Sequence, residues 1–131
     1  MSESSQQKAI IQWLKLKGAY VLRLNSGSLT KQYKGGFHHI QLCPRGTPDL
    51  YVLLNGYSCF IEVKKDEKEI KAWQTQFKNF QKTARITPYN QRSVHQHKQQ
   101  NKIRDAGGFT LVACSVKMVE EDLKALSILT H

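Results

Sequence analysis

Asp49, Glu62 and Lys64 are the residues whose types and spacing in this sequence best fit a catalytic site. Two carboxylates that lie side by side can hold a hard divalent cation. A lysine amine next to such a cation can hold or polarise a water molecule. This chemistry requires the chain to bring the three residues together, although they are distant in the sequence.

A β-hairpin is predicted between these residues. Residues 50–54 are apolar and β-prone, Asn55-Gly56 is a strong signal for a two-residue turn, and residues 57–63 are again β-prone. The hairpin folds Asp49, which precedes the first strand, back beside the end of the second strand. Two carboxylates and an amine are therefore expected at one edge of the sheet.

Glu62 and Lys64 are predicted to point the same way and Val63 the opposite way, because side chains alternate between the two faces of a strand. Charges at strand ends are often ordinary solvated charges. Here Pro48-Asp49 lies at hairpin distance from Glu62, and the apolar Ile61 and Val63 mark the strand as part of the core. The pattern therefore favours a functional site.

The remaining sequence predicts the elements that position this hairpin. Hydrophobic periodicity predicts helices at residues 6–17, 66–81, 93–106 and 116–129, the first of them capped by Ser4 or Ser5. β-prone runs predict further strands at 19–24, 37–42 and 109–114. Residues 27–36 are polar and contain glycine, which predicts a mobile loop. This order indicates one domain over residues 1–131, of the α/β (α+β) class, with a small mixed sheet flanked by helices.

Composition and charge limit the possible partners. A chain of 131 residues can bury a core of its own. The formal net charge is +10, and residues 1–105, which hold the candidate site, carry 18 of the 20 Lys and Arg residues. A basic surface around an acidic pocket suits a polyanionic substrate and a metal cofactor. The apolar stretches are too short to span a membrane, and three cysteines without a CxxC pair are typical of reduced thiols, so we expect a cytoplasmic protein.

Several motifs together resemble a known family. Residues 46–50, Gly-Thr-Pro-Asp-Leu, followed by residues 61–64, Ile-Glu-Val-Lys, resemble the PD-(D/E)xK nuclease signature. The flanks resemble the virus-type replication-repair nuclease (VRR-NUC) family: Glu3-x-x-x-Gln7, residues 23–27, and Ser93-x-x-Gln96 before Gly107-Gly108. The resemblance covers nearly the whole chain and implies a restriction-endonuclease-like core.

The resemblance implies a metal-dependent phosphodiesterase. Asp49 and Glu62 would bind Mg²⁺ or Mn²⁺, with the carbonyl of Val63 as a further ligand and Glu3 completing the metal shell. Lys64 would orient the attacking water and stabilise the charge that develops on phosphorus.

The sequence departs from compact family members at residues 65–92, which separate the Glu-x-Lys strand from the Ser-x-x-Gln helix. This helical insertion would serve as a dimer arm or a DNA contact. It makes Gln74, Gln76 and Gln96 competing candidates for the family glutamine. Gln96 fits best, because one helix of the expected length separates it from Gly107-Gly108, and it would position the water or Lys64.

DNA is the expected partner. The sequence contains no module for reading bases, so shape and phosphate contacts are the natural mode of recognition. Candidate contacts are Arg23, Asn25, Ser26, Lys31, Lys34, Arg45, Lys98, Lys102 and Arg104.

The leading hypothesis is a structure-selective endonuclease that cuts branched DNA such as four-way (Holliday) junctions. Stand-alone family members are small, often viral or prophage proteins, which implies a bacterial or phage-infected host cell. A homodimer would suit two symmetric cuts, and the stripe of Trp73, Phe77 and Phe80 would mark its surface if the core leaves that stripe unburied. The alternatives are a flap or single-strand nuclease or exonuclease, a non-catalytic basic DNA-binding protein, and a nucleic-acid chaperone.

Overall fold

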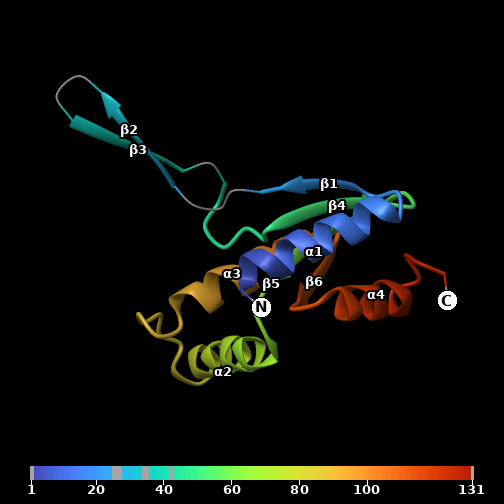
Figure 1. The fold of residues 1–131 in the computed structure, drawn as a ribbon. Helices are drawn as coiled ribbons and strands as arrows, with labels where there is room; N and C mark the ends of the chain where they lie inside the picture. Colours follow the sequence, from blue (N-terminus) through green and yellow to red (C-terminus); the bar gives the residue numbers. More distant parts are fainter. Residues whose placement is uncertain (1, 25–27, 34–35, 42, 131) are drawn as a thin grey trace.

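The computed structural model describes residues 2–24, 28–33, 36–41 and 43–130. Its centre is a four-stranded sheet in the order β1-β4-β5-β6 (Figure 1). The strands are β1 Tyr20–Arg23, β4 Leu50–Leu54, β5 Tyr57–Val63 and β6 Phe109–Ala113. β4 pairs antiparallel with β1 and β5, whereas β5 and β6 run parallel. This mixed sheet with surrounding helices confirms the predicted fold class.

The hairpin that carries the candidate site forms as the sequence predicts. Asn55 and Gly56 join β4 to β5, and their φ angles of 52° and 83° are the positive values that a type I′ turn requires. The turn fixes a register in which Leu50 lies opposite Ile61. Asp49 therefore lies beside the last residues of β5.

Helices cover the two faces of the sheet differently. α1 (Glu3–Leu16) and α4 (Val116–Ala125) pack on the face that holds the apolar core, with Ile10, Leu14, Ile61, Leu111, Val119 and Leu123. α3 (Gln91–Asp105) lies against the other face, and α2 (Glu67–Thr83) packs on α3. Because Ile61 and Val63 point into the core, Glu62 and Lys64 point toward α3.

The predicted helices and strands are present, with shifted ends. Those predicted at 66–81, 93–106 and 109–114 correspond to α2, α3 and β6 within two residues at each end. α1 begins at Glu3 rather than at residue 6, because the Ser2 hydroxyl accepts the Ser5 N–H (3.1 Å) and caps the helix in place of Ser4 or Ser5. None of the helices in the described part of the chain has the length and hydropathy needed to cross a membrane.

The C-terminal helix ends sooner than predicted. α4 stops at Ala125 rather than at residue 129, because Ser127 adopts a φ of 60° and turns the chain. Ile128 then folds back: its N–H donates to the Leu123 carbonyl (2.9 Å) and its side chain is buried. The apolar pattern beyond Ala125 therefore reflects residues that are buried in the core, and it does not indicate a continued helix.

The described residues within 27–36 form strands, where composition predicts a mobile loop. Ser28–Tyr33 is β2, which pairs antiparallel with β3 (Gly36–Gln41) in a separate two-stranded sheet. Figure 1 shows this hairpin projecting away from the main sheet. The prediction was wrong because hydrophobic patterning detects strands that face a core, and a ribbon outside the core does not need that pattern. β3 confirms the strand predicted at residues 37–42.

Candidate active site

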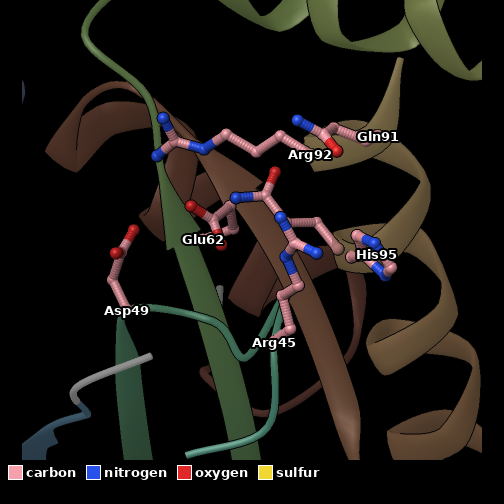
Figure 2. Close-up of a pocket in the computed structure, with 8 residues that line it drawn as sticks. Arg45, Asp49, Glu62, Gln91, Arg92 and His95 are labelled. Atoms are coloured by element: carbon pink, nitrogen blue, oxygen red, sulfur yellow. The ribbon is translucent and has the colours of Figure 1, made fainter. Parts of the chain in front are cut away.

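Asp49 is held beside the end of β5 by two backbone hydrogen bonds. Val63 N–H donates to Asp49 Oδ2 (2.7 Å), and Leu24 N–H donates to the Asp49 carbonyl (2.8 Å). The first bond ties the carboxylate to the residue that follows Glu62. Figure 2 shows the Asp49 and Glu62 carboxyl groups on neighbouring strands, both lining one cavity. The hairpin therefore brings the two acids together.

The Glu62 carboxyl group is buried and only partly satisfied. The residue is 1% exposed, and Oε1 has no hydrogen-bond partner among the described residues. Oε2 lies 3.8 Å from Lys64 Nζ. Burial, and then the nearby Asp49 carboxylate, raise the pKa of Glu62 to about 9. Glu62 Oε1 is thus a buried acceptor without a partner, and it lies next to a second carboxylate. A cation bound between the two acids would supply the missing partner.

Lys64 is also buried, and Gln96 from α3 holds its amine. Lys64 Nζ donates to Gln96 Oε1 (3.1 Å), and the lysine is 3% exposed. Of the other two candidate glutamines, Gln74 is exposed, and Gln76 lines a second, smaller cavity that Lys64 and Arg92 also line. Of the three candidates, Gln96 is therefore the glutamine that bonds to Lys64 among the described residues.

The comparisons with known proteins agree with this geometry. No family model matches the sequence, and no curated protein sequence is significantly similar to it. Among solved structures, the chain is similar to one described as a VRR_NUC domain, with a TM-score of 0.53 and 25% identity over 95% of this chain and 96% of that chain.

This match over nearly the whole chain supports the resemblance to the VRR-NUC family. VRR-NUC domains are nucleases, so the match supports a nuclease domain, and a nuclease domain implies DNA as its substrate. Nuclease folds of this kind usually use a divalent metal. The match thereby supports the expected family and agrees with DNA as the expected class of partner.

The site fits a divalent cation through Asp49 and Glu62, whose oxygens are the hard ligands that Mg²⁺ and Mn²⁺ prefer. Val63 is the last residue of β5 and lies between Glu62 and Lys64 in the sequence. Its carbonyl remains the predicted further ligand. Glu3 lies close enough for the Asp49 charge to contribute, after burial, to raising the pKa of Glu3. However, no three His, Cys, Asp or Glu side chains among the described residues form a metal cluster. Glu3 therefore lies outside the Asp49–Glu62 pair, and its role as a ligand stays a prediction.

The loop before Asp49 packs directly on α3. Gly46 has a φ of 87°, and a Cβ atom at this position would lie 2.3 Å from the His95 carbonyl oxygen. Only glycine allows this close approach of the two backbones. The approach places Arg45 on the rim of the cavity that holds Asp49 and Glu62.

Further rim residues come from α3, and the sequence analysis missed them. The cavity, of about 340 Å³, is lined by Arg45, Gly46, Asp49, Glu62, Gln91, Arg92, His95 and Gln96. In Figure 2 Arg92 extends from α3 toward β5, while Arg45 rises from the loop below. Neither guanidinium group forms an ion pair with a described carboxylate. Arg92 precedes Gln96 by four residues, and this helical spacing was the available signal.

His95 adds a third nitrogen-bearing side chain to the rim. Burial first, and then the charges of Arg45 and Lys98, lower the pKa of His95. A histidine that is neutral near pH 7 accepts as well as donates a hydrogen bond. The rim therefore offers two fixed positive charges and one neutral imidazole around the carboxylates.

The other predicted DNA-binding residues do not line this cavity. Lys98 Nζ lies 5.6 Å from the Phe80 ring centroid, and Arg104 donates to Thr110 Oγ1 (2.6 Å) and Asn101 Oδ1 (2.5 Å). The remaining positions lie elsewhere: Lys102 beside a separate cavity, Arg23 exposed on β1, Lys31 in β2, and Asn25, Ser26 and Lys34 outside the described residues.

The aromatic stripe of α2 is packed within its own chain. Trp73 is 7% exposed, and the His97 ring stacks between Trp73 and Phe77, with centroids 3.8 Å from each. Phe80 is half-buried beneath Lys98. The idea that this stripe remains free for a partner is therefore wrong, because α3 provides the apolar partner that the sequence analysis did not identify.

Proposed function

We propose that this domain is a metal-dependent, structure-selective DNA endonuclease that hydrolyses phosphodiester bonds, with branched DNA such as four-way junctions as its preferred substrate. The observation that carries the proposal is the pair of the half-buried Asp49 and the buried Glu62 in a cavity that Gln96 also lines, with Lys64 bonded to Gln96. A buried carboxyl group is costly unless it is paired. A bound cation would supply the partner that Glu62 Oε1 lacks among the described residues.

Asp49 and Glu62, with the carbonyl of Val63, would hold Mg²⁺ or Mn²⁺. When bound, the ion supplies Lewis acidity and lowers the pKa of a coordinated water. The amine of Lys64 is fixed by Gln96 at 3.1 Å and by Glu62 at 3.8 Å. It would orient the attacking water and stabilise the negative charge that grows on the phosphate oxygens. Gln96 would fix the direction in which that amine points.

The rim of the cavity would position the phosphate group. Arg45 and Arg92 lie on different elements, and an unpaired guanidinium group binds phosphate oxygens in a bidentate manner. Contacts of this kind carry no base information. Recognition of DNA by shape is therefore the natural mode for this site.

A homodimer would place two such sites across one junction, which a monomer cannot do. Because the aromatic stripe of α2 packs against α3, the support for a dimer comes instead from the open edge of the main sheet. β1 is an edge strand, and on and beside it Tyr20, Leu22 and Leu53 are 59%, 42% and 40% exposed. Tyr20 lies directly opposite Leu53 in the sheet. Exposed apolar residues on an edge strand favour pairing with a second chain.

The test is a cleavage assay with Mg²⁺, Mn²⁺ or EDTA on a four-way junction, a flap, single-stranded DNA and linear duplex. We expect cutting only with metal, and fastest cutting of the junction. Preferred cutting of the flap or the single strand would favour the alternative nuclease or exonuclease. Binding without cleavage of any substrate would favour the non-catalytic DNA-binding protein.

We also propose that this activity belongs in the cytoplasm of a bacterial or phage-infected cell. The free thiols at Cys43, Cys59 and Cys114 support this location.

A further inference from the structure

Trp73 of α2 makes a polar contact with the candidate site. Its indole Nε1–H donates to Gln96 Oε1 at 2.6 Å, and its ring lies 5.7 Å from Lys64 Nζ. The residue belongs to the segment 65–92, which the sequence analysis sets apart as an insertion. A buried indole N–H needs an acceptor. Here the acceptor is the side chain that also holds the candidate catalytic lysine.

The Trp73 bond determines which way the Gln96 amide points. Trp73 Nε1 and Lys64 Nζ both donate to Gln96 Oε1, so its two acceptor positions are occupied. With the oxygen held in this way, the Nε2 amide is the group that Gln96 offers to the cavity that it lines with Asp49 and Glu62. Without the indole, only the lysine amine would hold the amide, and the group could rotate.

Trp73 is itself held rigidly. His97 stacks on one face of the indole at 3.8 Å, and the Ser93 hydroxyl donates to the Trp73 carbonyl at 2.6 Å. Burial is the largest cause of the lowered pKa of His97, so its ring is neutral and packs as an aromatic group. The indole thus reaches Gln96 from a support whose position is set by packing on α3.

We propose that Trp73 is a positioning residue for phosphodiester hydrolysis: it holds the Gln96 amide so that Lys64 is fixed beside Glu62 and the amide N–H group faces the substrate. This inference rests on the proposed function. The segment 65–92 would then have a role within its own chain, because its Trp73 supports the position of the site residue Gln96. The competing account is that Trp73 only fills space between α2 and α3.

Trp73→Phe separates these accounts, because it keeps an aromatic ring against His97 and removes the N–H donor. The matched control is Phe80→Leu, which reduces a half-buried aromatic residue of the same helix that has no side-chain donor to offer Gln96. We expect Trp73→Phe to lower the single-turnover cleavage rate about 10-fold, the effect of losing one hydrogen bond, with DNA affinity unchanged. Phe80→Leu should stay within about 2-fold of the parent.

A double-mutant cycle with Gln96→Leu tests whether Trp73 acts through Gln96. If it does, Trp73→Phe has no further effect on the rate in the Gln96→Leu background. Effects that multiply, or equal losses in Trp73→Phe and Phe80→Leu, would overturn the proposal in favour of simple packing.

The same inference has a readout that needs no cleavage. In the parent, NMR should show the side-chain amide of Gln96 as one pair of sharp resonances. In Trp73→Phe the pair should broaden or shift toward the position of a free amide, and in Phe80→Leu it should remain unchanged. An unchanged Gln96 amide in Trp73→Phe overturns the inference even if the protein cuts DNA. If the Gln96 amide changes in Trp73→Phe but the parent protein cuts no DNA, the positioning of Gln96 by Trp73 holds and the proposed function is wrong.

Discussion

At the scale of single residues, the state of the Glu62 carboxyl group decides how the site behaves. A carboxyl group in a buried place is disfavoured in its charged form, and the Asp49 carboxylate adds to this effect. Lys64 opposes both influences but does not cancel them. A divalent cation between the two acids would reverse the balance, because it favours the charged form of each. Folding, protonation and metal binding are therefore linked at one carboxyl group.

Substitution of either acid should abolish cleavage and spare DNA binding. Asp49→Asn and Glu62→Gln each remove a ligand charge with little change in size, so the fold and the basic rim should persist. We expect cleavage of a four-way junction to fall below detection, while affinity for DNA measured in EDTA changes less than about 3-fold. Unimpaired turnover by either variant would remove the hairpin from the active site.

The pH dependence of stability should reveal Glu62 directly. Its pKa rises from the ordinary glutamate value of 4.5, which applies to the unfolded chain, to about 9 in the folded, metal-free protein. Between these values the folded state binds more protons than the unfolded state, so stability is greatest near the lower value and falls as the pH rises. We expect the Tm in EDTA to decline from about pH 5 to pH 9 and to decline less in Glu62→Gln, which has no proton to lose. A variant with the same slope as the parent would contradict the assignment.

At the scale of elements, the loop from Cys43 to Pro48 depends on one close approach to α3. Gly46 and Gly18 share a φ of 87°, but a Cβ atom would lie 2.3 Å from the His95 oxygen at Gly46 and would touch nothing within 4 Å at Gly18. The two glycines therefore form a matched pair. One tests backbone strain alone, and the other tests strain together with the contact.

Gly46→Ala should destabilise the protein more than Gly18→Ala. Both variants carry the cost of a left-handed residue, about 1 kcal/mol. Gly46→Ala should cost about 1–3 kcal/mol more, because the loop must move away from α3. We expect its cleavage to fall as well, since Arg45 and Asp49 flank the glycine. Urea unfolding and a junction-cleavage assay measure the two effects, and equal behaviour of the variants would show that the approach is not essential.

Some features of the fold and of the candidate site could be predicted from the sequence alone, and others could not. The β4–β5 hairpin was predictable because its alternation and its Asn-Gly turn are local signals. Gln96 was predictable because one helix of fixed length links it to Gly107-Gly108. The contact of Trp73 with Gln96 was not predictable, since it depends on how α2 packs on α3. The hydrophobic periodicity of each helix does not indicate how the two helices pack together. Arg92 was overlooked for the same reason, because its helical spacing from Gln96 becomes informative only once the site is known.

At the scale of the whole molecule, charge should govern DNA binding. Each phosphate contact adds about −0.9 to the slope of log K against log salt. Arg92→Ala should therefore reduce the magnitude of this slope by about 0.9 and weaken binding similarly for unrelated sequences. The control is Lys117→Ala on α4, across the sheet, where Lys117 is exposed and pairs with Glu121. An unchanged slope in Arg92→Ala would take this arginine out of the phosphate site.

Dimerisation through the open edge of the main sheet is the remaining property of the whole molecule. Leu22 lies on β1, and a charge there would be buried between two chains in a dimer but solvated in a monomer. We expect Leu22→Lys to shift the mass from dimer to monomer in light scattering at micromolar concentration, and to lower cutting of a four-way junction more than cutting of a linear duplex. Leu16→Lys is the control, since Leu16 on α1 is 81% exposed and has little to lose. A parent protein of monomer mass that cuts junction and duplex equally would refute both the dimer and the junction preference. A dimer that resists Leu22→Lys would place the contact on another surface.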